Sequence, residues 1–464
     1  MLEKFFKLKE NNTNVRTEVL AGVTTFMTMA YILAVNPTTM TAFNDILGLE
    51  GSARMNPNGV FMATAIAAFV GTLLMALLAN YPFAMAPGMG LNAYFAYTVV
   101  LKMGYTWQMA LAAVFFEGLI FILLSLTNVR EAIFNAIPTT LKFAVSTGIG
   151  LFIAFIGLQN AKIVENNDAT LVQFHAFHGD GVTQTANVAV ILAIIGVIIT
   201  AILLIKQVKG GILFGILITW ILGIICELTG LYVVTPDAGY YSLLPSFSSG
   251  FQFGAIADVA FKVDFSKVFS LEFVVVMFAF LFVDMFDTLG TLIGVSAKAN
   301  MLDKDGKLPR IRGALLSDAV GTTTGALLGT STVTTYVESA TGVSEGGRTG
   351  LTALTTAVLF LLSIFLSPIF LAIPSFATAP ALIIVGALML KSVVQINWND
   401  FTESLPAFVV IVSMPFTYSI ATGISLGFIF YPIIKLLSGR YRDVSIPVWI
   451  LALLFILRFL YLNN

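Results

Sequence analysis

Two aspartates, Asp284 and Asp287, interrupt an apolar run that extends from residue 271 to residue 295 and reads LEFVVVMFAFLFVDMFDTLGTLIGV. A run of this length can cross a bilayer as one helix. A carboxylate at that depth costs roughly 2.5–3.5 kcal/mol, so such groups normally face a bundle interior or a water-filled cavity, where they bind a ligand or carry protons. Their three-residue spacing places both on one helix face. The alternative is a structural role, in which hydroxyl groups of a neighbouring helix satisfy both carboxylates.

The rest of the chain is apolar as well, with 58% hydrophobic and only 11% charged residues among 464. Soluble domains carry about 25% charged residues, so this composition predicts a multi-pass protein of the lipid bilayer. The net charge of −1 gives no basic surface for nucleic acid. Residues 1–17 are polar and lack the apolar core and cleavage site of a signal peptide, so they are expected to form a cytoplasmic N-terminal segment.

Long apolar runs predict an all-α protein with fourteen membrane spans in two sets of seven. The first set is 18–36, 60–79, 87–101, 108–126, 141–158, 188–205 and 212–229. The second set is 272–293, 313–329, 333–345, 350–367, 376–392, 404–419 and 421–437. The corresponding units are a first repeat at 18–230, an extracellular connection at 231–271 and a second repeat at 272–438. The C-terminal apolar segment, 439–464, either crosses once more or lies in the interface.

The two sets repeat one another at an offset of 250 residues. Residues 70–78 read VGTLLMALL and residues 320–328 read VGTTTGALL. An odd number of spans in each repeat gives the two repeats opposite orientations, the inverted arrangement of many secondary transporters. Small residues let membrane helices approach closely, so Gly71 and Gly321 of this motif are expected to pack against the half-helices of the spans that follow.

The distribution of basic residues supports this span count. With the N-terminus in the cytoplasm, 18 of the 24 Lys and Arg residues fall inside and 5 outside, and Arg458 is unassigned. Membrane proteins place most Lys and Arg of short loops on the cytoplasmic side. A missed span would have scrambled the ratio.

The third span of each half begins poorly as a helix. Residues 80–100 contain Pro82, Pro87, Gly88 and Gly90, and residues 330–347 begin with threonine and valine and continue with small polar residues. Each is predicted to be a short extended stretch followed by a half-helix. Paired broken spans at corresponding positions point to the central binding site of a transporter.

These broken spans carry polar residues that could bind a ligand. Glu338 lies in the second and Asn92 in the first, with the aromatic residues Phe83, Tyr94 and Tyr336 nearby. Carboxylates and an amide among aromatic rings would suit a small planar ligand rich in N–H donors. Each residue has a structural alternative: a carboxylate at a helix start for Glu338, a cap on broken backbone for Asn92, and core or lipid packing for the rings.

Other chemistries find little support in the sequence. The lone Cys226 excludes an intrachain disulfide, and His175 and His178 of the polar connection 159–187 are expected to be solvated loop residues and not metal ligands. The chain has no nucleotide-binding G-x-x-x-x-G-K-[ST] motif, so an ion gradient is the expected energy source. No cofactor or metal is expected.

The three acids already named are the candidates for proton coupling. Asp284, Asp287 and Glu338 are the only strong acids expected to be buried near the site. Burial disfavours the charged form of a carboxylate, so such a group could bind and release a proton during transport.

Four segments resemble the AzgA-like purine permeases, a branch of the nucleobase–ascorbate and nucleobase–cation symporter group. They are TTFMTMAYILAVNP (24–37), APGMGLNAYF (86–95), FVDMFDTLGTLIGV (282–295) and ESATGVSEGGRTGLTA (338–353). The resemblance extends over essentially the whole chain. It implies the seven-plus-seven fold of the uracil permeases, with a core domain and a gate domain, and proton-coupled uptake of hypoxanthine, guanine or adenine.

The resemblance also implies roles for individual residues. Asp284 and Glu338 match the acids of the eighth and tenth spans that bind the base, and Asp287 would support the site or the proton. Asn92 matches the asparagine of the third span. The Q/E-N-x-G signature of the xanthine and uric-acid branch is absent, because this chain has ESATG at 338–342.

The sequence therefore predicts a proton-coupled importer of purine nucleobases in the cell membrane, with Asp284, Glu338, Asn92, Phe83 and Tyr336 contacting the base. One alternative is the same fold transporting uracil, xanthine or a small anion, although an anion transporter would favour a basic residue in the tenth span. A channel would conduct regardless of a proton uncoupler, and a membrane enzyme would need a motif such as H-E-x-x-H, which is absent. The preferred purine, the proton stoichiometry and the choice between monomer and homodimer stay open.

Overall fold

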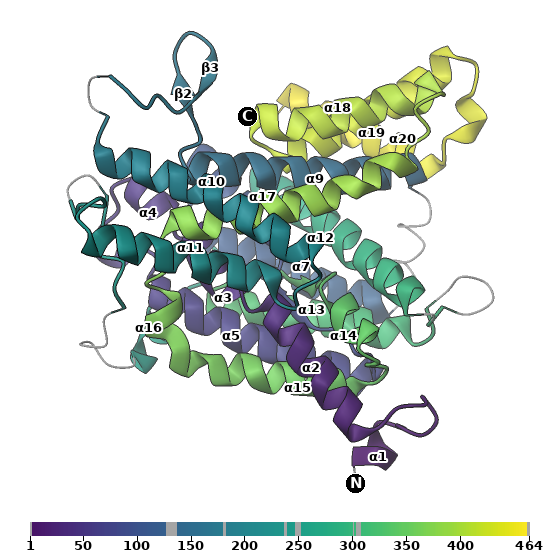
Figure 1. Ribbon diagram of the computed structural model, residues 1–464. Coiled ribbons are helices and arrows are strands. Elements are labelled where there is room, and N and C mark those ends of the chain that lie inside the picture. The colour runs from purple at the N-terminus through teal and green to yellow at the C-terminus, as the bar shows by residue number, and fades with distance from the viewer. Residues whose placement is uncertain are drawn as a thin grey trace.

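The computed structural model describes residues 2–126, 137–179, 182–235, 239–245, 252–299, 301–302 and 308–461. Most of them are helical, and the long helices run side by side across the molecule (Figure 1). Three of the basic residues that the charge count assigned to the inside, Arg130, Lys304 and Lys307, lie outside the described residues.

The first seven predicted spans are all found. They are α2 (Val15–Met29) with α3 (Ile32–Met40), α5 (Pro57–Leu74) with η2 (Met75–Ala79), β1 (Met85–Pro87) with α6 (Met89–Ala93) and η3 (Tyr94–Lys102), α7 (Trp107–Leu126), α9 (Thr139–Asn160), α10 (Gln184–Ile205) and α11 (Gly211–Leu228). Before and between them lie α1 (Leu2–Phe5), α4 (Phe43–Ile46), η1 (Gly51–Ala53), and the strands β2 (Val164–Asn167) and β3 (Leu171–Phe174).

The second seven spans are present too. They are α12 (Leu271–Lys298), α13 (Ile311–Leu328), β4 (Val333–Thr335) with α14 (Ser339–Ser344), α15 (Gly350–Leu362) with η6 (Ser363–Leu366) and α16 (Ser367–Phe370), α17 (Ser375–Met389) with η7 (Leu390–Gln395), α18 (Phe401–Thr417) and α19 (Ile420–Leu437). The remaining elements are η5 (Phe253–Asp258), η8 (Tyr441–Asp443) and α20 (Ile446–Tyr461).

Ten helices of the described residues are long and apolar enough to cross a bilayer unaided. The predicted spans outside this set are the two broken ones, α13 and the 17-residue α18. The broken spans contain the short strands that the sequence predicted, so the expectation of a mostly helical fold with two extended interruptions is confirmed.

Several helices begin where the sequence offers a cap. The side chains of Asn14, Asn56, Thr183, Thr349 and Ser419 each accept a hydrogen bond from a backbone N–H in the first turn that follows. Such caps satisfy N–H groups that the helix itself leaves without a partner. Each second span ends at a residue in the left-handed region, Asn80 (φ 52°) after η2 and Gly329 (φ 100°) after α13, and the chain there turns into a broken span.

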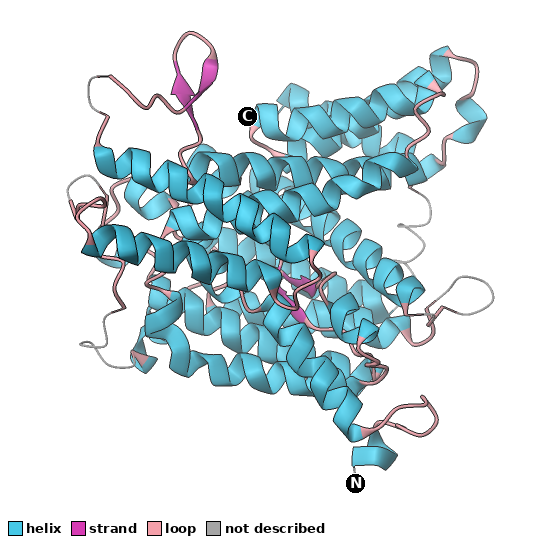
Figure 2. Cartoon of the chain, in the orientation of Figure 1, coloured by secondary structure: helices cyan, strands magenta, loops and turns pink. Residues whose placement is uncertain are grey.

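Strands β1 and β4 pair antiparallel in the middle of the bundle, while β2 and β3 form a hairpin that projects from its edge (Figure 2). Met85 lies opposite Thr335, which is 250 residues further along the chain. On one side of this pair Ala86 faces Thr334, and on the other side the Tyr336 N–H donates to the Ala84 carbonyl at 3.0 Å. The register is therefore symmetric about Met85 and Thr335, as a two-fold relation with an offset of 250 requires.

Helix packing follows the same symmetry. Helix α2 packs on α15 as α12 packs on α7, and α5 packs on α15 as α13 packs on α7. In a second set of helices, α9 packs on α18 as α17 packs on α10. We call α2, α3, α5, α7, α12, α13, α15 and the broken spans the core group, and α9, α10, α11, α17, α18 and α19 the gate group.

The repeated glycines meet at the centre of the core group. A Cβ atom on Gly321 would lie 3.3 Å from the Gly71 Cα and 3.3 Å from Val333 Cγ1, and one on Gly71 would lie 3.1 Å from Val333 Cγ1. Close packing at these glycines was predicted, but the predicted neighbour was wrong. The glycines pack on each other and on the strands, because the half-helices begin only after β1 and β4.

Loops gather in two groups at opposite ends of the spans. At one end Asn56 bonds Asp258 at 2.7 Å, and the Asp264 N–H donates to the Gln108 carbonyl at 3.1 Å. These contacts join loops that the charge count placed outside the cell. At the other end, Phe6 and Leu8 of the N-terminal segment are buried against the ends of α5 and α15.

The C-terminal segment forms α20 along α19. Its Phe455 ring lies 6.0 Å from that of Phe428 in α19 and 6.3 Å from that of Phe282 in α12. Aromatic contacts thus attach α20 to both groups of helices.

Candidate functional site

The two broken spans meet in the interior, where their backbone groups need partners. Thr72 of α5 both donates to the Met85 carbonyl and accepts from its N–H, and Thr322 of α13 bonds Val333 in the same way, at 2.9–3.2 Å. Backbone that is not helical survives at membrane depth only where protein or a water-filled cavity satisfies it. The paired threonines supply bonds that strands of three residues cannot make for themselves.

Glu338 stands directly before α14 at the end of the second extended stretch, and its side chain is partly exposed. The hydroxyl of Tyr31 donates to Glu338 Oε1 at 2.7 Å. Tyr31 is fully buried at the junction of α2 and α3. The neighbouring Tyr336 reaches the other broken span, where its hydroxyl donates to the Pro87 carbonyl at 2.5 Å.

The two aspartates of α12 have different surroundings, although they share one helix face. Asp287 is partly exposed, and the negative charge of Glu338 acts on it. A Cβ atom on Gly88 would lie 3.5 Å from Asp287 Oδ2 and 2.8 Å from Thr334 Cγ2, so this carboxylate borders the first broken span at a residue that has no side chain. Asp287 and Glu338 are thus near enough for their charges to interact.

Asp284 is fully buried and points into a cluster of polar groups between helices. The hydroxyl oxygen of Thr288 lies 3.0 Å from Asp284 Oδ1, 2.7 Å from Asp318 Oδ1 and 2.7 Å from Thr334 Oγ1. A hydroxyl has one proton, so Thr288 can donate to only one carboxylate at a time. Asp284 and Asp318 are therefore linked through Thr288 behind strand β4.

Two buried acids beside the second broken span were missed from the sequence. They are Asp318 of α13 and Glu117 of α7, whose Oε2 accepts a hydrogen bond from Thr332 at 2.8 Å, and both are fully buried. The expectation of only three buried acids near the site is therefore wrong. The same rule that singled out Asp284 would have found Glu117, which interrupts the apolar run of residues 108–126.

Asn92 lies in α6, and its backbone N–H donates to the Gly88 carbonyl at 2.9 Å. Its Oδ1 accepts a hydrogen bond from the Ser331 hydroxyl, and its Nδ2 is buried with no acceptor in the described part of the chain. Phe83 is buried too, but its ring stacks on that of Tyr81 at 5.2 Å. The Arg310 guanidinium, directly before α13, lies 4.6 Å from the centre of the Tyr81 ring. Phe83 therefore stacks on a ring that lies at the end of the spans.

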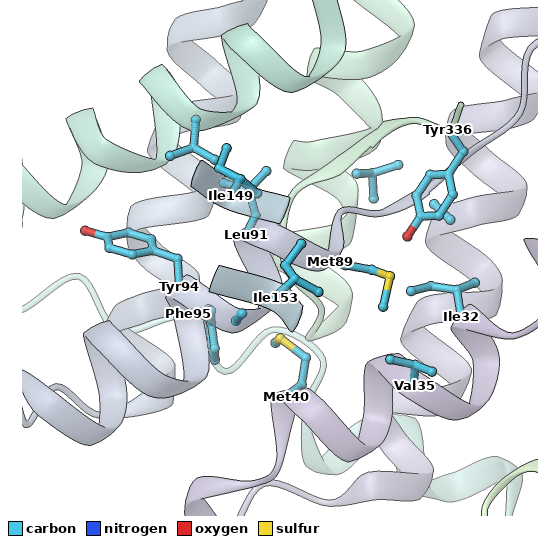
Figure 3. Packing of buried hydrophobic residues seen from close by; sticks show 14 of the residues in the cluster. Ile32, Val35, Met40, Met89, Leu91, Tyr94, Phe95, Ile149, Ile153 and Tyr336 are labelled. Atoms are coloured by element: carbon cyan, nitrogen blue, oxygen red, sulfur yellow. The ribbon is translucent and has the colours of Figure 1, made fainter. Parts of the chain in front are cut away.

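Half-helix α6 is where the core group meets the gate group. Ile149 and Ile153 of α9 lie beside Leu91, and Met89 points toward Ile32 (Figure 3). A Cβ atom on Gly90 would lie 2.8 Å from Ile149 Cγ2, so a glycine is needed for this approach. The apolar contact closes the first broken span against the gate.

Polar contacts join the two groups at each end. At the end with Lys102, its ammonium donates to the Thr417 carbonyl at 3.0 Å and the Thr98 hydroxyl donates to the Tyr418 carbonyl at 3.1 Å. At the other end, Lys209 between α10 and α11 pairs with Glu345 after α14 at 2.7 Å. The contacts at the two ends are related by the inverted repeat. Each joins the end of one broken span to the loop between the last two helices of the other half.

Two further polar regions lie elsewhere. His175 is buried, contrary to the expectation of a solvated residue, and its ring nitrogens lie 2.8 Å from Glu165 Oε1 and 2.8 Å from Asn187 Oδ1. A cavity of about 430 Å³ is bordered by the N-terminal segment, Tyr81, Arg310 and Arg348, and does not include the acids of the broken spans.

Solved structures share this fold. The transmembrane domain of the cyanobacterial bicarbonate transporter BicA aligns with a TM-score of 0.59 at 16% identity, over 89% of this chain and 97% of that one. Murine solute carrier 26 family member A9, an anion transporter in the inward-facing state, aligns with a TM-score of 0.62 at 11% identity, over 91% of this chain and 68% of that one. The fold is the seven-plus-seven inverted repeat of these transporters.

Sequence relatives extend over the whole chain. "Putative permease MJ0326" of Methanocaldococcus jannaschii is 47% identical over 100% of this chain and 99% of its own length. The guanine/hypoxanthine permease PbuG of Bacillus subtilis is 45% identical over 100% of both chains. The adenine permease AdeP of Escherichia coli is 43% identical over 100% of this chain and 97% of its own length.

The Permease family model (Xan_ur_permease) matches residues 16–426, which include both broken spans and all five acids around them. The match extends over most of the chain, and the relatives above 40% identity are permeases, so this is a family of transporters and not of enzymes. The chain therefore belongs to the Permease family of membrane transporters.

Proposed function

We propose that the chain imports purine nucleobases together with protons across the cell membrane, with the N-terminus in the cytoplasm. Hypoxanthine and guanine are the first candidate substrates, and adenine is the next. The observation that carries the proposal is the meeting of Glu338 and Asp287 beside the broken spans. The names of the relatives supply the substrate class, because PbuG is a guanine/hypoxanthine permease and AdeP an adenine permease.

Carboxylates at this position suit the edge of a purine. A carboxylate accepts two hydrogen bonds in one plane, and hypoxanthine and guanine present N–H groups along their ring edges. Tyr31 holds Oε1 of Glu338, no other side chain of the described residues is hydrogen-bonded to this carboxylate, and Tyr336 is two residues away in the chain. Small anions such as bicarbonate would meet two negative charges here, so the substrates of the fold relatives are not proposed for this chain.

The two aspartates receive different roles in this proposal. Asp287, which is partly exposed and close to Glu338, contacts the base. Asp284, which is buried with Thr288 and Asp318, holds or transfers the proton. The family resemblance assigned base contact to Asp284. Because Asp287 is partly exposed and Asp284 is fully buried, we propose base contact for Asp287 and the proton for Asp284 instead.

Asn92 and the aromatic residues contribute less directly. The amide nitrogen of Asn92 is available to donate to an acceptor on the base. Tyr336 fixes the second broken span against the Pro87 carbonyl through its hydroxyl. Phe83 would act on the substrate only through its stacking on Tyr81.

Competition for uptake tests the substrate class. Cells that express the chain and lack their own purine uptake are given labelled hypoxanthine with excess guanine, adenine, xanthine, uracil or bicarbonate. Guanine should abolish the labelled uptake, adenine should reduce it, and the other three should leave it intact. Strong competition by uracil or xanthine, with none by guanine, would refute the proposed substrates.

Proton coupling needs a separate measurement. Uptake should collapse with a protonophore and rise as the external pH falls from about 8 to about 6, because a buried carboxylate must take up a proton during each cycle. The control is a sodium gradient imposed without a proton gradient. Uptake that follows sodium and ignores protons would overturn the coupling while leaving the substrate in place.

A further inference from the structure

Among the residues that the structure describes, Tyr31 is the one whose side chain is hydrogen-bonded to the Glu338 carboxylate. Its hydroxyl donates to Oε1 at 2.7 Å, a short distance that is typical of a hydrogen bond to a charged acceptor. The ring is fully buried, so no solvent competes for the donor. The tyrosine comes from span 1 and the acid from span 10, which are 307 residues apart in the chain.

One face of the first span, from α2 to the turn that follows it, contacts α14 or the residue before it at three successive points. Thr25 and the Ala21 carbonyl lie against Gly342, where a side chain would not fit. The Thr28 hydroxyl lies 3.0 Å from that of Thr341, which donates to the Glu338 carbonyl at 2.6 Å. Tyr31 is next along this face, because residues three apart on a helix are neighbours.

Tyr31 differs from the other two contacts in what it touches. Residues 25 and 28 hold the backbone and hydroxyls of α14, whereas Tyr31 holds the carboxylate itself. A glutamate side chain has three rotatable bonds, and a bond to one oxygen restricts all of them. The bond also stabilises the negative charge of Glu338, which acts on Asp287.

We propose that Tyr31 is a positioning residue for transport, which holds Glu338 Oε1 so that Oε2 faces the purine. The inference rests on the proposed function, since it deepens the role of Glu338 in binding the base. Without the hydroxyl, the carboxylate would rotate freely beside Asp287, and each binding event would have to fix it again.

Tyr31→Phe tests the inference, since it removes one oxygen atom and keeps the ring. Equilibrium binding of hypoxanthine to the purified protein should weaken about tenfold, the usual consequence of losing a hydrogen bond to a charged group. The uptake rate at saturating hypoxanthine should change little. Thr28→Val, on the same face of α2, removes a bond to α14 that does not touch the carboxylate, so it should weaken binding much less.

An infrared measurement separates positioning from a general structural role. The carboxyl band of Glu338 is identified as the band that differs between the spectra of the wild-type and Glu338→Gln proteins, both recorded without hypoxanthine. Tyr31→Phe should shift this band, whereas Thr28→Val should leave it in place. Site-specific 3-fluorotyrosine at position 31, a stronger donor, should shift the band in the opposite sense and serves if Tyr31→Phe does not fold.

The outcomes are distinct. Wild-type protein that binds hypoxanthine, with equal affinity and an unmoved Glu338 band in Tyr31→Phe, overturns the inference and leaves the proposed function standing. Equal losses in Tyr31→Phe and Thr28→Val, without a band shift, also overturn it, since they reveal only packing of α14. Wild-type protein that binds no purine overturns the proposed function and the inference with it.

Discussion

The two broken spans share one frame and carry different chemistry. In each, a threonine of the preceding span fixes a three-residue strand, and the strands pair symmetrically about Met85 and Thr335. The first span then presents an amide, Asn92, and closes against the gate at Gly90. The second presents a carboxylate, Glu338, that is partly exposed.

The comparison shows what an inverted repeat fixes and what it leaves free. Symmetry places two strand ends and two half-helices at the centre of the bundle, which prepares a site. The residues within that frame then differ, because the second half carries the carboxylate of Glu338 and the first carries the amide of Asn92 and the close approach of Gly90 to the gate group. Charge is the clearest difference, because none of the described residues of β1, α6 and the eight residues that follow is acidic.

Glu338→Gln should have the largest effect on uptake. It would show whether the charge in the second broken span contributes more to transport than the amide in the first. The amide keeps the shape but loses the charge and one acceptor, so uptake should fall at least about a hundredfold. The paired change in the first span, Asn92→Ala, removes a neutral group and should cost about tenfold or less. Uptake is measured alongside membrane abundance, and similar losses in both would contradict the asymmetry.

The aspartates of α12 give the next effect. Asp287→Asn should remove most purine binding, because this carboxylate lies beside Glu338. Asp284→Asn should leave binding within a few-fold but stop proton-driven accumulation, because Asp284 lies with Thr288 and Asp318. Binding and accumulation are measured on the same two variants, and the reverse pattern would restore base contact to Asp284.

Much of the frame could be predicted from the sequence. Apolar runs located the fourteen spans, the poor helix formers of residues 80–100 and 330–347 predicted the two short extended stretches, and the rule for buried charge found Glu338 and both aspartates of α12. The three-residue spacing could not say which aspartate faces the site. That depends on which side chains, here Asp318 and Thr334, pack on α12 from elsewhere.

Other site residues gave too weak a signal. Tyr31 lies inside a quoted motif, but one tyrosine in a chain that is 12% aromatic does not stand out. Its importance comes from a contact with a residue 307 positions away, which no local pattern contains. Phe83 was chosen because it is aromatic and close in sequence to the strand, yet its ring contact leads to Tyr81.

Gly71→Leu and Gly321→Leu should produce an intermediate effect and test the shared frame. Their added Cβ atoms would meet Val333 and the opposite glycine at 3.1–3.7 Å, so a leucine would push the strands apart. Overpacking of this kind typically costs 1–3 kcal/mol. Hypoxanthine affinity should fall about tenfold in both variants, although neither residue touches a proposed ligand group.

Leu77→Ala is the control for this pair, because Leu77 belongs to the same motif but is 45% exposed. It should bind as the wild-type protein does. Unchanged affinity in both glycine variants would mean that the repeat is real but does not frame the site. A loss in one variant alone would show that the two halves of the frame do not contribute equally.

The contacts between core and gate should give the smallest effect. Lys209 and Glu345 pair at 2.7 Å, but their side chains are 54% and 33% exposed. Exposed ion pairs contribute about 0–1 kcal/mol, which corresponds to at most about fivefold in a rate. Lys209→Gln should therefore change the uptake rate by no more than that and leave purine affinity alone, because neither residue lies among the acids of the site.

The charge-swapped protein, with Lys209→Glu and Glu345→Lys together, makes this prediction specific. It rebuilds the pair with opposite polarity, so it should recover the wild-type rate that each single reversal loses. At the other end, Lys102→Gln removes a bond to a backbone carbonyl, for which no charge swap exists.

The salt concentration gives a second test of the Lys209–Glu345 pair. If this contact must open in each cycle, raising the salt concentration should reduce the difference between wild-type and Lys209→Gln, since screening weakens exposed pairs. A salt-independent difference, or a swap that recovers nothing, would mean that Lys209 acts through the shape of its loop and not through its charge.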